Sequence, residues 1–86
     1  MDKELKEKWV AALRSGDYGQ TTGCLVDGRG HCCLGVLCEV AGFGLHFWTE
    51  LLSRGGPPAR TQRELALMND NGKSFEQIAD WIEENL

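Results

Sequence analysis

The segment Cys33–Ala41 constrains the fold most, because all but two of its residues, Gly35 and Glu39, are apolar. A surface helix has polar residues along one side, whereas a segment that is apolar nearly all round is buried. The length fits a helix of two to three turns that ends before Gly42. We therefore predict a buried central helix here, preceded by a strand that ends near Cys32. A buried strand is the alternative, because the period of a short apolar run does not distinguish the two.

The residues before this segment predict a helix and a hairpin. Residues 2–15 form an amphipathic pattern, with Asp2 as the helix cap and an apolar stripe on one face. Gln20–Val26 predicts a strand, and His31–Cys32 opens the return strand after an Asp-Gly turn. We expect this hairpin to lead directly into the central helix.

The residues after Gly42 predict two or three more short helices. Residues 45–53 are a short helix or an irregular apolar segment, and the Gly- and Pro-containing residues 54–60 form a loop. A capping box from Thr61 to Glu64 predicts a helix that runs to about residue 69. Ser74 and Gln77 repeat that spacing for the last helix. The fold class is therefore α+β and mostly helical, with four to five short helices around the buried one and a small β-hairpin.

Composition narrows the class of protein. At 86 residues, with 42% hydrophobic and 26% charged residues, the chain predicts one soluble domain over residues 1–86. It contains neither a run long enough to span a membrane nor a signal-peptide pattern, so we expect a cytoplasmic protein with reduced cysteines and no membrane partner. The net charge of −4 argues against duplex nucleic acid as a partner.

The four cysteines and a neighbouring histidine raise the question of zinc. Structural zinc sites normally present pairs of ligands such as C-x-x-C, and this chain has no such pair. Small buried side chains are the simpler interpretation. We therefore expect no metal and no cofactor. The residues considered are Cys24, Cys32, Cys33, Cys38 and His31.

Thiol catalysis is a further alternative. Cys33 lies at the start of a predicted helix, where the helix dipole favours a thiolate. The base would be His31 or His46, and no third residue suggests itself to orient either one. An enzyme is therefore the less favoured interpretation, and we assign no catalytic residues.

Several side chains are suited to an anionic ligand. Arginine and tryptophan bind nucleotides or protein partners through stacking and charge-assisted hydrogen bonds. A lysine beside a helix start can hold a phosphate, and polar side chains at the hairpin end could add donors. A solvated loop is the alternative for the arginines. The predicted ligand-binding residues are Tyr18, Gln20, Trp48, Arg54, Arg60, Arg63 and Lys73.

The last helix carries a second candidate surface, where four acidic residues surround Trp81. Trp81 falls outside the apolar stripe of that helix, so it is either a boundary residue or part of a contact surface. We predict that Trp81, Asp80 and Glu84 bind a protein partner.

Three stretches carry a resemblance to a known family: WVxALRSGxYxQ at residues 9–20, CCLGVLC at 32–38, and NDxGxSFxxIADxIE at 69–83. Together they resemble a family of small proteins encoded by bacteriophages and prophages. The resemblance implies an accessory protein that acts in the bacterial host cytoplasm.

The resemblance further implies inhibition of host machinery, either by binding a protein or by sequestering a nucleotide immune signal. The first expectation is a non-enzymatic anti-defence protein that sequesters a nucleotide immune signal. The alternative is an inhibitor that binds a host protein through the acidic last helix. Association with a second copy of the chain is left open.

Overall fold

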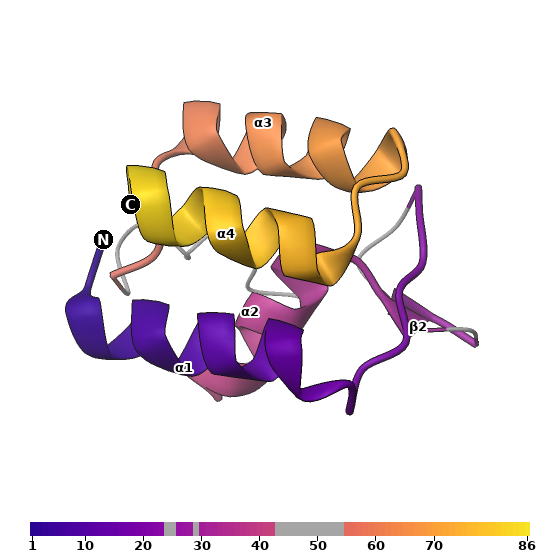
Figure 1. The fold of residues 1–86 in the computed structure, drawn as a ribbon, viewed down its shortest axis with the longest axis horizontal. Coiled ribbons are helices and arrows are strands. Elements are labelled where there is room, and N and C mark those ends of the chain that lie inside the picture. The colour runs from indigo at the N-terminus through magenta and orange to yellow at the C-terminus, as the bar shows by residue number, and fades with distance from the viewer. Residues whose placement is uncertain (24–25, 29, 43–54) are drawn as a thin grey trace.

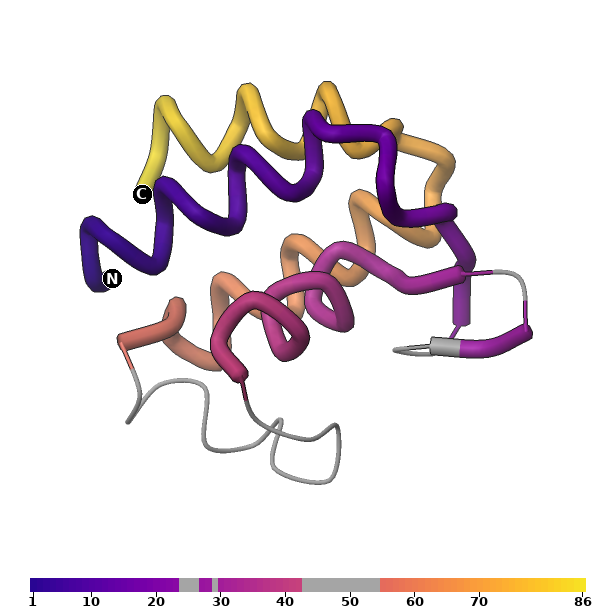
Figure 2. The backbone as a smooth tube through the Cα atoms, turned by 90° about the horizontal axis from the view of Figure 1, so that it is seen from below, coloured from indigo at the N-terminus to yellow at the C-terminus, as the bar shows by residue number. Residues whose placement is uncertain are grey.

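The computed structural model describes residues 1–23, 26–28, 30–42 and 55–86. Within them the chain forms four helices and a small hairpin (Figure 1), so the predicted mostly helical α+β class is confirmed. Helices α1 and α3 each contact both α2 and α4, and Figure 2 shows α1 and α4 together on one side of the molecule. The elements are α1 (Lys3–Ser15), β1 (Val26–Asp27), β2 (Gly30–His31), α2 (Cys33–Ala41), α3 (Ala59–Asp70) and α4 (Phe75–Asn85).

Helix α2 is the buried helix that its apolar sequence predicts. All six residues from Cys33 to Cys38 are buried, and Gly42 ends the helix in the left-handed conformation at φ 79°. The side chain of Trp9 in α1 is fully buried, and its indole Nε1 donates a hydrogen bond to the Cys33 carbonyl at 2.9 Å. Burial of this large aromatic surface fixes α1 against the start of α2.

The helix ends follow the sequence in α1 and α4 but not in α3. The Asp2 carboxylate caps α1, and Ser74 and Gln77 form the predicted capping box of α4. The capping box predicted at Thr61 is wrong, because α3 begins at Ala59 and Thr61 lies inside its first turn. The reason is Pro58, whose extended backbone and fixed φ suit the residue before a helix.

The hairpin is confirmed, but its first strand is shorter than predicted. Val26 lies opposite His31 in the antiparallel pair β1–β2. Gln20 instead forms an isolated parallel bridge with His31, and the Thr21 amide donates to the His31 carbonyl at 2.9 Å. Residues 19–21 therefore lie along the other edge of β2. Gly23, at φ 80°, turns the chain between the two edges.

The predicted segment 45–53 lies outside the described residues, as do Cys24, His46, Trp48 and Arg54. The predicted loop 54–60 is only partly correct, since residues 56–58 are irregular but α3 already begins at Ala59. None of the described helices combines the length and apolar character that a membrane crossing requires.

Candidate functional site: the seam between α1 and α4

Arg14 joins α1 to three carboxylates of α4. Its guanidinium lies 3.1 Å from Glu76, 2.8 Å from Asp80 and 3.3 Å from Glu83. The hydrogen bond to Asp80 is the main reason that the pKa of Arg14 is raised above its ordinary value, and the negative charges of Glu83, Asp80 and Glu76 add to it. The arginine therefore stays charged and holds the two helices side by side.

Sequence reasoning missed this network, although α4 carries a signal for it. Glu76, Asp80 and Glu83 are spaced at i, i+4 and i+7, which places them on one face of a helix. Three carboxylates on one face predict a facing cation. Which cation it would be depends on how α1 packs, because Arg14 is 62 residues from Glu76.

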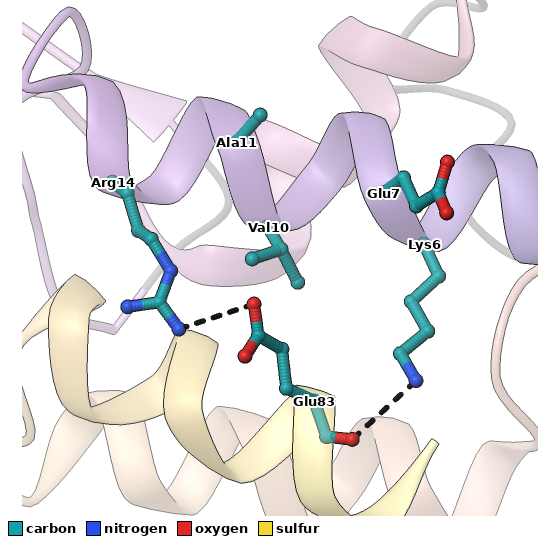
Figure 3. A pocket seen from close by; sticks show the side chains of 6 residues that line it. All are labelled: Lys6, Glu7, Val10, Ala11, Arg14 and Glu83. Carbon is teal, nitrogen blue, oxygen red and sulfur yellow. Dashed lines mark hydrogen bonds and ion pairs between the residues drawn. The ribbon is translucent and has the colours of Figure 1, made fainter.

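A depression of about 330 Å³ lies along the seam between α1 and α4 (Figure 3). It is lined by Lys6, Glu7, Val10, Ala11, Arg14 and Glu83. Most of its surface is apolar, and Val10 and Ala11 of α1 contribute to its lining. Lys6 spans one end, where its Nζ donates to the Glu83 carbonyl at 3.5 Å, while Arg14 reaches the Glu83 carboxylate at the other. The seam thus combines an apolar lining with charged edges.

The three predicted partner-binding residues lie within about 100° of one another around α4, in different environments. Asp80 belongs to the Arg14 network, Glu84 is exposed, and Trp81 is partly buried against the core. Trp81 is thus a boundary residue of the core. It lies about 160° around α4 from Glu83, so it does not share the seam.

The predicted ligand-binding residues divide into two groups. Gln20 and Lys73 lie together, because the Gln20 amide donates to the Lys73 carbonyl at 2.7 Å. Arg60 and Arg63 are exposed on the first two turns of α3, whereas Lys73 follows the end of that helix, where its amide donates to the Met68 carbonyl at 3.1 Å. The two groups therefore lie towards different ends of α3.

The hairpin end is held by a buried amide that sequence reasoning did not assign to the site. The fully buried Asn69 side chain accepts from Gln20 at 2.9 Å and donates to the Thr21 carbonyl at 2.7 Å. The sequence signal for its burial was its spacing of four residues from Leu65, which places both side chains on the same face of the helix. Gln20 is therefore engaged in holding the fold together.

Tyr18, the aromatic residue at the hairpin end, packs against His31. The Tyr18 ring meets the His31 ring edge-on, with centroids 5.3 Å apart. His31 Nε2 lies 3.7 Å from Glu39, and its buried Nδ1 has no hydrogen-bond partner within the described chain.

The thiols of Cys33 and Cys38, considered above for metal binding or catalysis, belong to the core. Cys33 and Cys38 are fully buried, and burial raises the pKa of both, that of Cys38 to about 11. The Cys33 thiol donates to the Leu65 carbonyl at 3.6 Å. Since the thiolate is the reactive form, this environment favours an inert packing role. Across the described part of the chain, no three His, Cys, Asp or Glu residues cluster as metal ligands would.

Together, the fold and the seam define a small helical α+β protein with a charged interhelical depression. The chain belongs to the family described as Domain of unknown function (DUF8296), whose model matches residues 1–44. The matched part includes α1, the hairpin and α2. Neither a curated protein nor a solved structure matches the chain.

Proposed function

We propose that the protein is a non-enzymatic accessory protein of bacteriophages or prophages that binds a host protein in the bacterial cytoplasm and inhibits it. The observation that supports this proposal is the depression between α1 and α4, which offers an apolar lining within charged edges. Recognition surfaces of this kind combine a desolvated apolar centre with a polar rim.

The charge of the seam indicates the chemistry of the partner. Two cations, Lys6 and Arg14, lie among four carboxylates, those of Glu7, Glu76, Asp80 and Glu83. The surplus of two negative charges favours a partner segment that carries lysine or arginine. Such a side chain can place its aliphatic stem on the apolar lining while its charge stays near the carboxylates.

The test is capture of a partner from bacterial lysate by the tagged protein, followed by affinity measurement with the purified partner. Ala11→Trp fills the depression from an exposed helix position. It should weaken binding at least about tenfold, the effect expected at the centre of an interface. Asn85→Trp is the matched control. It places the same side chain at an exposed position of α4 outside the depression, and this variant should bind the partner as the parent chain does.

Salt and Trp81 provide two further readouts. Binding should weaken as salt rises, because charge attraction contributes to it. Loss of binding in Trp81→Ala would show that the interface also includes the part of α4 that carries Trp81, outside the seam. A partner that binds Ala11→Trp and the parent chain equally well would contradict the proposal.

A second candidate function is sequestration of a nucleotide immune signal at the start of α3. Its support is that Pro58 provides no side-chain cap there, while Arg60 and Arg63 are exposed nearby. Uncapped amides and arginines both favour an anion. A thermal-shift screen with cyclic nucleotides and ADP-ribose derivatives tests it. A ligand should raise the melting temperature of the parent chain but not of Arg60→Gln/Arg63→Gln, and this function fails if no compound raises it.

A further inference from the structure

We propose that α3 is the interface of a symmetric homodimer, in which the α3 helices of two copies pack antiparallel across Leu67. This inference does not depend on the proposed function, which uses the seam between α1 and α4. Leu67 is 56% exposed and is the one exposed large hydrophobic side chain in the described part of the chain. It lies on α3, which forms an edge of the molecule in Figure 1.

The charged residues around Leu67 are arranged on both sides of it. With about 100° and 1.5 Å per residue, Arg63 lies about 40° to one side of Leu67 and about 6 Å towards the start of α3. Asp70 lies about 60° to the same side and about 4.5 Å towards the end of the helix. Both residues are exposed.

A two-fold axis through Leu67 brings these opposite charges together. The axis reverses the direction of the helix but keeps each residue on its own side, so Arg63 of one copy lies beside Asp70 of the other. Symmetry makes this contact twice. The two Leu67 side chains meet on the axis and exclude water between the two ion pairs.

The other side of the same face is also complementary. Glu64 and Asn71 are exposed and lie about 60° and 40° from Leu67, on the side away from Arg63. The same axis places Glu64 of one copy beside Asn71 of the other, where the amide of Asn71 can donate to the carboxylate. A parallel arrangement would place Arg63 beside Glu64 of the other copy, but it would also bring the exposed Arg60, about 20° from Leu67, beside its own counterpart.

The size of the face sets the expected strength. A single twelve-residue helix buries less than the roughly 800 Å² per partner of a typical stable interface. We therefore expect a weak dimer in rapid exchange with monomer, with a dissociation constant in the micromolar range or above.

The test is sedimentation velocity over protein concentrations from about 10 μM to about 1 mM, a range suited to weak association. The parent chain should shift from monomer to dimer. Arg63→Asp alone and Asp70→Arg alone should each stay monomeric at these concentrations, since each places like charges at both symmetric contacts. An equimolar mixture of the two variants should form the heterodimer, because both symmetric contacts then pair opposite charges, one with the original residues and one with the charges exchanged.

Fold and net charge are controlled separately. Asp70 also accepts a hydrogen bond from the Gly23 amide at 3.0 Å, so circular dichroism and thermal unfolding must show that Asp70→Arg is folded. Leu67→Arg is a second variant at an exposed position, and it should also be monomeric. Lys8→Asp and Glu84→Arg make the same charge changes on exposed positions of α1 and α4, and they should dimerise normally.

A parent chain that stays monomeric up to the highest concentration would overturn the proposal, as would a dimer that Leu67→Arg and Arg63→Asp leave intact. Neither result would affect the partner-binding test at the seam, whose variants lie on α1 and α4.

Discussion

The side-chain oxygen of Asn69 in α3 accepts a hydrogen bond from the backbone amide of Cys33, the first residue of α2, at 3.3 Å. The same oxygen accepts from Gln20, and the Asn69 amide nitrogen donates to the Thr21 carbonyl. One buried side chain therefore joins α3, the start of α2 and the segment that leads into the hairpin. It also satisfies backbone groups that would otherwise be buried without partners.

Asn69→Ala should lower the free energy of unfolding by about 2–4 kcal/mol, because it leaves buried polar groups unpaired. Gln20→Ala is the matched control: it removes one partner of Asn69 at an exposed position and should cost less than about 1 kcal/mol. Urea denaturation monitored by tryptophan fluorescence measures both. Equal losses in the two variants would argue against the role given to Asn69.

The observed helix starts predict opposite outcomes for two hydroxyl residues. Ser74 caps α4 by accepting from the Gln77 amide at 3.1 Å, so Ser74→Ala should cost about 1 kcal/mol. Thr61 lies inside α3, where alanine is the better helix former, so Thr61→Ala should change stability by less than about 0.5 kcal/mol. Thermal unfolding of the two variants distinguishes them. A larger loss at Thr61 would mean that α3 begins there after all.

Two glycines of the hairpin should respond differently to alanine. A Cβ at Gly30 would collide with the Gly19 carbonyl, which accepts from the His31 amide, whereas a Cβ at Gly28 meets nothing within 4 Å. Gly30→Ala should therefore lower the free energy of unfolding by about 1–3 kcal/mol by forcing the segments apart. Gly28→Ala should be close to neutral. Hydrogen exchange of the His31 amide would show whether the stability is lost at the hydrogen bond between this amide and the Gly19 carbonyl. Unchanged protection of the amide in Gly30→Ala would contradict this explanation.

Stability should fall in mildly alkaline solution because the buried thiols retain their protons. Burial raises the pKa of Cys38 to about 11, so between about pH 9 and pH 11 the unfolded chain loses a proton that the folded chain keeps. The free energy of unfolding should therefore decrease with pH, by up to about 1.4 kcal/mol per pH unit for each such thiol. The pKa of Cys33 is raised in the same direction.

Urea denaturation at a series of pH values up to about pH 10 checks this slope, within the range where an ordinary thiol titrates. Cys38→Ala should make the slope shallower, whatever its effect on stability at neutral pH. A slope that the variant leaves unchanged would show that Cys38 does not contribute.

Much of the fold could be predicted because the helices carry local signals. The apolar run of α2, the Asp2 cap and the Ser74 capping box each act within one helix, and the structure agrees with all three. The start of α3 was mispredicted because a matching capping-box pattern at Thr61 competed with the backbone preference of Pro58. Local residue preferences alone do not decide which of two nearby N-cap candidates, Pro58 or Thr61, begins the helix.

The candidate site could be predicted less well. The sequence identified Asp80 and the acidic face of α4 but gave no indication of Arg14 as their counter-charge. It also grouped Lys73, which follows the end of α3, with Arg60 and Arg63 in the first two turns of that helix. Residue type shows what a side chain can bind, whereas its neighbours depend on how the helices pack.

The sequence by itself determined which described segments become helices, where most of them end, and which faces of α1 and α4 are buried, because periodicity and capping operate over three to four residues. Only the tertiary structure decided that Arg14 meets Asp80 across 66 residues, that Asn69 meets Cys33 across 36, and that a depression remains between α1 and α4. These features depend on the relative positions of whole helices, which are set by the packing of the entire core.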